Sequence, residues 1–281
     1  MPQPLPPEAL DDFITRTLAE DVGSGDVTAE ATIPANARFR ASMGARENLV
    51  LAGLPIAAAI IERLAPDATI SATATDGDHL TTGASIAIIE APARALLTAE
   101  RSALNILQHL SGIATQTSIY VAAIAGTKAK VLDTRKTIPG LRTLEKYAVK
   151  MGGGTNHRMG LYDAVMIKDN HIAVAGGVTA AINACRAQTD LTVQVECDTL
   201  NQVREALVAG ADSLLLDNMS LDQLREAVAL TDGRIPLEAS GGVRLDTIRG
   251  IAETGVDFIS VGRLTQSSPA IDIGMDFEAV V

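Results

Sequence analysis

Basic side chains gather in one stretch of this acidic chain, residues 133–171. Seven of the 23 lysines and arginines and two of the 4 histidines fall there, although the formal net charge is -11. Arg135 and Lys136 follow the apolar run Lys130–Leu132, and Lys168 closes the run Ala164–Ile167. Three adjacent glycines, residues 152–154, would let the backbone approach a ligand closely. Bases at strand ends beside such glycines indicate a site for a small, multiply charged anion.

A structural role explains only part of this stretch. Glu145, Lys146 and Lys150 have helical spacing, and we expect them on a solvated helix face. The other bases lie where strands end, and charged groups are rarely buried without a partner. An anion site is therefore the favoured interpretation of the remaining charges.

Residues 133–171 read DTRKTIPGLRTLEKYAVKMGGGTNHRMGLYDAVMIKDNH. This stretch resembles the signature of the quinolinate phosphoribosyltransferases, DTRKT-PG-R-EKYAV-GGG-NHR-GL-D-IKDNH. Two more segments resemble motifs of the same family, EDVGSGDVT at residues 20–28 and ERSALN at residues 100–105. The resemblance extends over nearly the whole chain from Glu20 onward.

The resemblance implies a reaction between two anionic substrates. The ring nitrogen of quinolinate attacks C1 of phosphoribosyl pyrophosphate, pyrophosphate leaves, and loss of a carboxylate as carbon dioxide gives nicotinate mononucleotide. This reaction is a step of de novo NAD biosynthesis. Arginine forks suit the two carboxylates of quinolinate, and the pyrophosphate donor normally arrives with Mg²⁺, which takes few carboxylates.

The resemblance also implies roles for individual residues. The catalytic set is Lys136, Lys168, Glu196 and Asp217. Quinolinate would be bound by Arg135, Lys136, His157, Arg158, Lys168 and Arg101 of the partner subunit. Phosphoribosyl pyrophosphate would be bound by Lys136, Lys168, Asp169, Asn170, His171, Glu196, Asp217, Ser240, Gly241, Gly242 and Gly262. Glu196 and Asp217 would hold Mg²⁺, directly or through water, and a shared Arg101 requires a homodimer or a higher homo-oligomer.

Simpler interpretations of several of these residues stay open. Glu196 and Asp217 could cap helices or pair with a barrel lysine, and Arg101 could be an exposed residue in the first turn of a helix. Cys197 needs no catalytic role and is read as a small buried residue. His79 is expected at the surface, and His109 is expected to be a helix packing residue rather than a ligand-binding one.

Two positions depart from the family pattern. The last motif often reads GALTHS, whereas residues 262–267 here read GRLTQS, so that Gln266 replaces a common histidine. Gln194 stands where a glutamate is frequent. Glutamine donates a hydrogen bond but carries no charge, and our hypothesis is that Arg263 compensates on the phosphate side.

Two alternative functions stay open beside the carboxylating enzyme. A nicotinate phosphoribosyltransferase of related fold would have less use for so many carboxylate-binding bases. An accessory protein of molybdate transport, from a family that resembles this one, would bind oxyanions without turnover. The complete DTRKT, GGGTNHR and IKDNH segments favour the enzyme.

Composition limits the remaining possibilities. The 281 residues are 47% hydrophobic but only 2% aromatic, with no tryptophan, which suits βα units with aliphatic cores. The acidic balance argues against a nucleic-acid surface. Cys185 and Cys197 form no redox or zinc pattern, and no signal peptide or membrane span is evident. We therefore expect a cytoplasmic protein with reduced thiols.

The first part of the chain predicts a small mixed α/β domain, residues 1–112. Helices are expected over residues 8–20 and 54–64, and strands over residues 37–51, 68–75 and 85–90. A long helical pattern covers Ala99–Ala125, and Gly112 is expected to break it into two helices.

The second part, residues 113–281, predicts repeated βα units. Apolar runs followed by helices close near Asp133, Lys168, Glu196, Asp217, Ser240 and Gly262. Such strand ends meet on one face of either a barrel or an open sheet. No G-x-G-x-x-G follows the first strand, which disfavours a dinucleotide fold. The resemblance implies a short, incomplete α/β barrel of about six or seven strands as the catalytic domain, and residues 265–281 are a candidate to return to the N-terminal domain.

Overall fold

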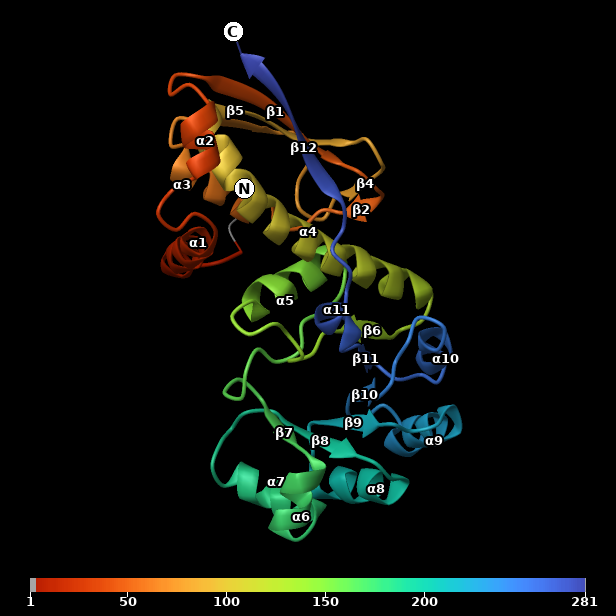
Figure 1. Ribbon diagram of the computed structural model, residues 1–281. Helices are drawn as coiled ribbons and strands as arrows, with labels where there is room; N and C mark the ends of the chain where they lie inside the picture. Colours follow the sequence, from red (N-terminus) through yellow and green to blue (C-terminus); the bar gives the residue numbers. More distant parts are fainter. Residues whose placement is uncertain (1–3, 281) are drawn as a thin grey trace. The chain divides into compact units, whose positions relative to one another are not determined.

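The computed structural model describes residues 4–280, which form two compact units (Figure 1). The first unit combines the described parts of Met1–Ser118, Pro139–Gly153 and Ser267–Val281, and the second combines Ile119–Ile138 and Gly154–Gln266. The sequence predicted a boundary between residues 112 and 113. Residues 139–153 nevertheless group with the first unit.

A four-stranded antiparallel sheet forms the frame of the first unit, in the order β12-β1-β5-β3. Its strands are β1 (Arg38–Ala45), β3 (Thr69–Ala72), β5 (Ser85–Pro92) and β12 (Ile273–Val280). Strands β2 (Leu49–Val50) and β4 (His79–Leu80) form a separate pair. The single strand expected over residues 37–51 is wrong, because bends at Arg46 and Glu47 separate β1 from β2.

Five helices accompany this sheet along the chain. They are α1 (Pro7–Asp21), α2 (Val27–Thr32), α3 (Leu54–Leu64), α4 (Ala93–Ala123) and α5 (Arg142–Met151). The predictions of α1 and α3 are confirmed. Acidic side chains accept hydrogen bonds from N–H groups that have no partner within the helix at the start of two of them. Asp26 accepts from the N–H groups of Thr28 and Ala29, and Asp76 accepts from those of Gly53 and Leu54.

Helix α4 is one continuous helix of 31 residues, so the predicted break at Gly112 is wrong. A Cβ atom at Gly112 would lie 2.0 Å from the carbonyl oxygen of Pro269. The glycine is therefore explained by close backbone approach rather than by a break in the helix.

The charges expected on a solvated face of α5 are largely buried, which corrects that prediction. Glu145 is 0% exposed and Lys146 is 1% exposed, and both have partners within the structure. His109 Nε2 lies 2.9 Å from Glu145 Oε1, which confirms that His109 packs between helices. Tyr147 donates a 2.7 Å hydrogen bond to Asp76, so this segment is part of the internal framework of the first unit.

The second unit is a six-stranded parallel sheet in the order β6-β11-β10-β9-β8-β7. The strands are β6 (Lys130–Leu132), β7 (Val165–Ile167), β8 (Val193–Cys197), β9 (Ser213–Asp217), β10 (Leu237–Ser240) and β11 (Phe258–Ser260). These positions confirm the predicted strand ends and the α/β class. Beyond the edge strand β6, Leu132 forms an isolated parallel bridge with Thr155.

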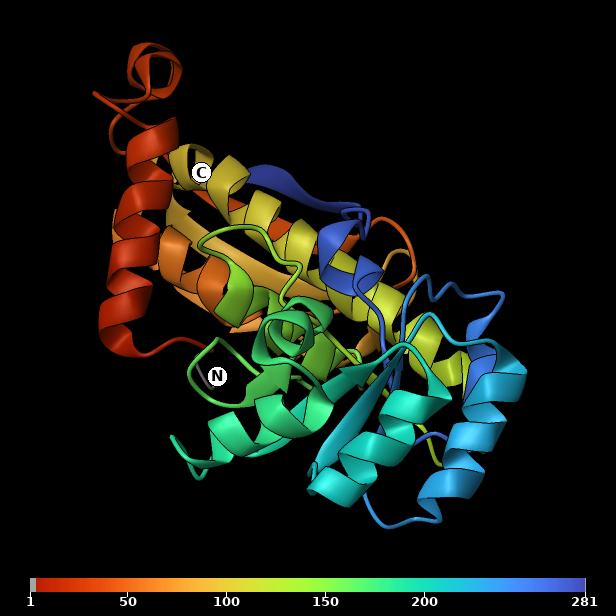
Figure 2. The same ribbon diagram turned by 90° about the horizontal axis from the view of Figure 1, so that it is seen from below.

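Six described helices follow the strands, and some of them pack against the sheet (Figure 2). They are α6 (Asp169–Ala175), α7 (Val178–Arg186), α8 (Leu200–Ala209), α9 (Leu221–Thr231), α10 (Ile248–Ala252) and α11 (Arg263–Gln266). Thr199 and Ser220 cap α8 and α9 with reciprocal bonds to the glutamines three residues later. These local signals fix where each helix starts, and hence the length of the loops above the sheet. No helix within residues 4–280 is long and apolar enough to cross a membrane.

Candidate active site

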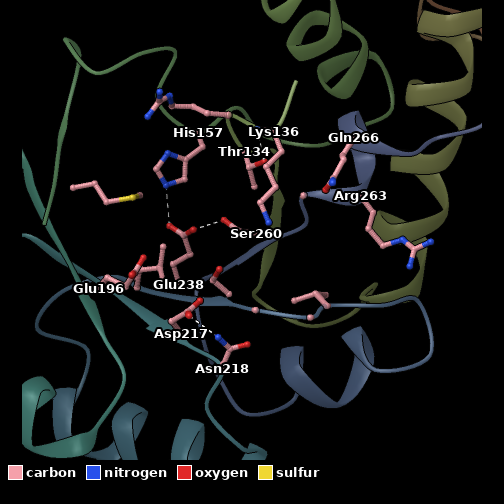
Figure 3. A pocket seen from close by; sticks show the side chains of 18 of the residues that line it. Thr134, Lys136, His157, Glu196, Asp217, Asn218, Glu238, Ser260, Arg263 and Gln266 are labelled. Atoms are coloured by element: carbon pink, nitrogen blue, oxygen red, sulfur yellow. Dashed lines mark hydrogen bonds and ion pairs between the residues drawn. The ribbon is translucent and has the colours of Figure 1, made fainter. Parts of the chain in front are cut away.

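A cavity of about 870 Å³ lies in the second unit at the carboxyl ends of the strands (Figure 3). Its lining residues all belong to that unit. The sequence-predicted residues among them are Arg135, Lys136, His157, Arg158, Lys168, Glu196, Asp217, Ser240, Gly241, Gly242 and Gly262. Parallel strands therefore bring together residues that are far apart in the sequence.

Four sequence-predicted residues lie elsewhere. Asp169, Asn170 and His171 form the first turn of α6, are exposed, and do not line the cavity. His171 Nδ1 instead accepts a 2.9 Å hydrogen bond from the N–H of Lys168. Arg101 is exposed on the part of α4 that belongs to the first unit.

Two arginines give the cavity its strongest anion-binding feature. The Arg158 guanidinium donates to the carbonyl oxygen of Ala164 at 3.2 Å and contacts Met166 Sδ at 3.6 Å. Burial lowers the pKa of Arg158, and repulsion from the Arg135 guanidinium lowers it further. Among the described residues, Arg135 Nε is buried without a hydrogen-bond partner. Two like charges and an unused donor at one site favour a bound carboxylate or phosphate.

Lys136 reaches the cavity across a glycine. A Cβ atom at Gly262 would lie 2.9 Å from Lys136 Cδ, so a larger residue there would displace the lysine side chain. The backbone of Lys136 is fixed by Thr265 Oγ1, which donates 2.6 Å to its carbonyl oxygen. Side-chain space therefore gives one reason for a glycine at residue 262, and its role in binding phosphoribosyl pyrophosphate stays a prediction.

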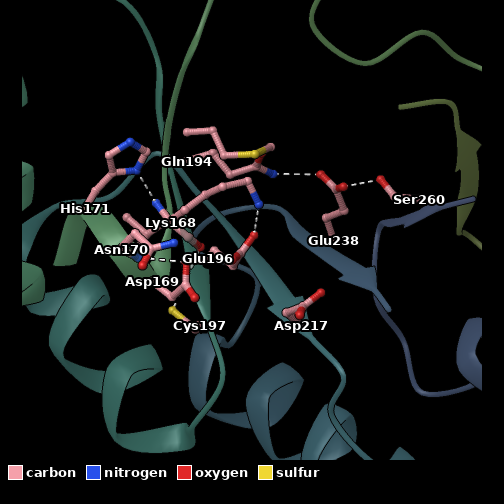
Figure 4. Close-up of polar contacts among 12 residues, drawn as sticks. Lys168, Asp169, Asn170, His171, Gln194, Glu196, Cys197, Asp217, Glu238 and Ser260 are labelled. Atoms are coloured by element: carbon pink, nitrogen blue, oxygen red, sulfur yellow. Dashed lines mark hydrogen bonds and ion pairs between the residues drawn. The ribbon is translucent and has the colours of Figure 1, made fainter. Parts of the chain in front are cut away.

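Lys168 and Glu196 form an ion pair between the ends of β7 and β8 (Figure 4). The Glu196 side chain is 11% exposed and that of Lys168 is 45% exposed. The sequence left open that Glu196 pairs with a barrel lysine, and the structure shows this pair. A ligand with hydroxyl or phosphate groups would still find both charges at the cavity wall.

Asp217 and the turn at residues 240–242 lie together. Asn218 Nδ2 donates to Asp217 Oδ2 at 2.6 Å, and the N–H of Asn218 donates to the carbonyl oxygen of Ser240 at 2.9 Å. A Cβ atom at Gly241 would lie 2.2 Å from Asn218 Oδ1. Both Gly241 and Gly242 have positive φ, at 96° and 59°, which favours glycine at both positions, and at Gly241 space requires it as well.

Within residues 4–280, the structure contains no group of three or more His, Cys, Asp or Glu side chains able to hold a metal ion. Glu196 and Asp217 nevertheless line one cavity from neighbouring strands. Two carboxylates fit Mg²⁺ that is also coordinated by substrate phosphates and water.

Comparison with known proteins gives the family of the chain. The family model for the quinolinate phosphoribosyl transferase C-terminal domain matches residues 113–276, and that for the N-terminal domain matches residues 26–111. The chain is 45% identical over 276 residues to the nicotinate-nucleotide pyrophosphorylase [carboxylating] of Mycobacterium leprae, covering 96% of this chain and 97% of that protein. The chain belongs to the quinolinate phosphoribosyltransferase family.

Solved structures of the family have the same fold. NadC from Streptococcus pyogenes matches with a TM-score of 0.95 and 42% identity, covering 99% of both chains. The nicotinate-nucleotide pyrophosphorylase from Francisella tularensis matches with a TM-score of 0.94 and 39% identity, covering 99% of this chain and 100% of that one.

The sequence analysis did not predict one acidic residue of the cavity. Glu238, on β10, is 3% exposed and lines the cavity. The available signal was a single carboxylate between Leu237 and Ala239 in a predicted buried strand. Arg263 and Gln266, the two residues of the altered last motif, also line the cavity. Cys197 is fully buried, as expected, and burial raises the pKa of its thiol to about 12.

Proposed function

We infer that this chain transfers the phosphoribosyl group of phosphoribosyl pyrophosphate to quinolinate with decarboxylation, in de novo NAD biosynthesis. The observation that carries this inference is the arginine pair, with the unused Nε donor of Arg135, in a cavity that also holds the Lys168–Glu196 pair. Membership of the family supplies the substrate class.

The residues support distinct parts of this reaction. Arg135 and Arg158 would bind the quinolinate carboxylates and hold the ring nitrogen toward C1 of the sugar. Lys136, Lys168 and the turn at residues 240–242 would bind the charged groups of phosphoribosyl pyrophosphate. Fixed charges of this kind favour the charge-separated transition state because they need no reorganisation during the reaction.

The bond changes balance without an enzyme nucleophile. The nitrogen lone pair forms the bond to C1 as the bond from C1 to pyrophosphate breaks. Carbon dioxide then leaves from C2, its bonding electron pair stays on C2, and water supplies a proton there. The positive ring nitrogen next to C2 stabilises that electron pair.

Glu196 and Asp217 are the residues that would hold Mg²⁺ together with the substrate. When bound, the ion would neutralise part of the pyrophosphate charge. The two carboxylates themselves would orient ribose hydroxyl groups, and Lys168 would keep Glu196 in place. A Mg²⁺ requirement that persists with phosphoribosyl pyrophosphate in excess would support this site, and activity that is unchanged in EDTA would contradict it.

The exposed Arg101 is proposed to complete the quinolinate site of a partner subunit in a homodimer or higher homo-oligomer. Mixing an Arg101→Ala variant with an Arg135→Ala variant tests this, because hybrid assemblies would contain one site with both arginines. Recovery of activity on mixing is expected, and no recovery after subunit exchange would contradict the proposal.

The decisive experiment is release of labelled carbon dioxide from carboxyl-labelled quinolinate with phosphoribosyl pyrophosphate and Mg²⁺, each omitted in turn. Arg135→Ala is expected to abolish release, whereas Arg225→Ala, an exposed arginine on α9 outside the cavity, is the matched control. Folded wild-type protein that releases no carbon dioxide would overturn the assignment. Turnover of nicotinate, or oxyanion binding without turnover, would then favour the two alternatives.

A further inference from the structure

Glu238 is a buried carboxylate in a cavity whose other features favour anions. It lies on β10, is 3% exposed and lines the cavity (Figure 3). Arg135 and Arg158 line the same cavity. A negative charge there opposes binding of a dianion unless the protein already neutralises it. Its partners therefore indicate what it does.

Three donors from three separate segments converge on this carboxylate. His157 Nε2 lies 3.1 Å from Oε2, Gln194 Nε2 lies 2.7 Å from Oε2, and Ser260 Oγ donates to Oε1 (Figures 3 and 4). Burial opposes ionisation of Glu238, but the hydrogen bonds from His157, Ser260 and Gln194 outweigh it and hold its pKa below the ordinary value. The carboxylate is thus ionised, and both of its oxygens accept hydrogen bonds from the protein.

Two hydrogen bonds define the tautomer of the His157 ring. His157 Nδ1 accepts a 2.7 Å hydrogen bond from the N–H of Arg158, so Nδ1 carries no proton. The proton lies on Nε2, where it is donated to Glu238. Both ring nitrogens are occupied by protein partners, and His157 acts here as a link between Glu238 and the Arg158 backbone. The sequence suggested a cationic ligand at this position.

Carboxylates hold this segment on both sides of the 157–158 peptide. Asp133, fully buried, accepts from Asn156 Nδ2 at 2.6 Å and from the N–H of His157 at 2.8 Å. Asp163 accepts from the N–H groups of Met159 and Gly160. These bonds restrain the backbone that carries the Arg158 side chain, whose guanidinium is repelled by that of Arg135.

A second cavity lies on the other side of His157, Arg158 and Glu238. This cavity, of about 410 Å³, is lined by His157, Arg158, Gln194 and Glu238 together with residues at the amino ends of the strands, such as Ser213 and Phe258. Of these four, His157, Arg158 and Glu238 also line the larger cavity. His157, Arg158 and Glu238 therefore separate the two cavities. With space on both sides, hydrogen bonds restrain Arg158: its N–H donates to His157 and its guanidinium donates to Ala164.

We propose that Glu238 is a positioning residue for the substrate carboxylates: it fixes His157 in the Nε2–H tautomer, which orients the Arg158 peptide and keeps its guanidinium beside Arg135. This inference rests on the proposed function for its substrate, and on the hydrogen-bond geometry for its mechanism. Gln194 has a defined part in it, because its amide donates to Glu238 where a glutamate would place a second negative charge.

Kinetics of Glu238→Gln test the proposal. An amide cannot accept from all three donors, so we expect the KM for quinolinate to rise about ten- to a hundredfold because Arg158 is misplaced. The affinity for phosphoribosyl pyrophosphate should stay within about threefold. Glu226→Gln, an exposed glutamate paired with Arg204 on the neighbouring helix, is the matched control and should behave as wild type.

Two further variants separate positioning from folding. Ser260→Ala removes one donor only, and should raise the same KM by a smaller factor. The double variant Gln194→Glu/Glu238→Gln exchanges donor and acceptor between the two positions, and should recover part of the quinolinate affinity. Equal losses for both substrates, or a thermal midpoint that falls while KM stays unchanged, would overturn the proposal.

The ring state can be measured without turnover. Two-bond ¹H–¹⁵N spectra of the 4 histidines should show His157 as the Nε2–H tautomer in the wild type and as a tautomer mixture in Glu238→Gln. An Nδ1–H tautomer in the wild type would overturn the mechanism. Wild-type protein that releases no carbon dioxide would overturn the proposed function alone, whereas active protein with unaltered Glu238→Gln kinetics would overturn this inference alone.

Discussion

Arg263 and Gln266 face the cavity from the short helix α11, at the two positions where the last family motif is altered. We predict that Arg263→Ala weakens binding of phosphoribosyl pyrophosphate about tenfold, because a charge-assisted hydrogen bond to phosphate is lost. Affinity for quinolinate should be unchanged. Equilibrium titration of each substrate against the variant measures both effects.

Arg225→Ala is the control for Arg263→Ala, because it removes an exposed arginine of α9 that does not line the cavity. Introducing Gln266→His into Arg263→Ala should restore part of the lost affinity, because the family's common side chain would then be present. Unchanged affinity of Arg263→Ala for phosphoribosyl pyrophosphate would refute compensation by Arg263.

Residue type and spacing were enough to identify most bases of the cavity, but not Arg244 or the buried acid Glu238. Lys168 directly follows β7, and Arg135 and Lys136 come shortly after β6, so their convergence follows from a parallel sheet. Glu238 depends on contacts with Gln194, His157 and Ser260, which only the folded sheet brings together. A local sequence window contains no information about such a network.

In helix α4, the substitution Gly112→Ala has two opposite effects on the free energy of unfolding. Gly112→Ala would stabilise an isolated helix by about 1 kcal/mol. In this fold the added Cβ atom would lie 2.0 Å from the Pro269 carbonyl oxygen, so backbone must move. We predict a net loss of about 1–3 kcal/mol in the free energy of unfolding, measured by urea titration.

Gly250→Ala in α10 is the matched substitution, because its Cβ atom would meet only Leu221 methyl groups, with Cδ1 at 3.4 Å. This variant should be neutral or slightly stabilised. If Gly112→Ala were also stabilised, close approach of the Pro269 backbone would not be the reason for the glycine.

Strand ends were predicted well and the inside of α4 was not, for a common physical reason. Apolar runs followed by polar residues determine where a buried strand stops, and this information is local. The role of Gly112 depends on Pro269, more than a hundred residues later in the chain. The burial of Glu145 and Lys146 likewise depends on tertiary partners, of which His109 is one.

At the scale of the whole molecule, the first unit depends on the last strand. β12 pairs with β1 from Arg38 to Ala45, and Phe277 packs against Phe39 with ring centroids 5.5 Å apart. We predict that a chain ending at Gln266 unfolds at lower temperature and aggregates, because the edge of β1 is exposed. Thermal unfolding with light scattering measures both effects.

Asp276→Ala is the control for this truncation. It removes the exposed ion pair with Arg46 but keeps the β12 ladder, and should change stability by about 1 kcal/mol or less. A truncated chain that remains as stable as this control would show that β12 does not support the first unit.

Composition and family pattern predicted two α/β parts and a return of residues 265–281 to the first, but not that residues 139–153 group with the first unit. The aliphatic, aromatic-poor sequence indicated βα units, and the second unit has them. The return of residues 139–153 to the first unit has no local signal, because a helix such as α5 has the same pattern in either unit.

The pairing of β12 with β1 also sets an order of events during protein synthesis. The ribosome releases β1 early, but the strand that covers its edge emerges only after every strand of the second unit has been made. The nascent chain must therefore carry an incomplete sheet with an exposed edge through most of translation. Chaperones that bind extended segments have their longest opportunity at β1, and the second unit is the part of the chain that can finish folding first.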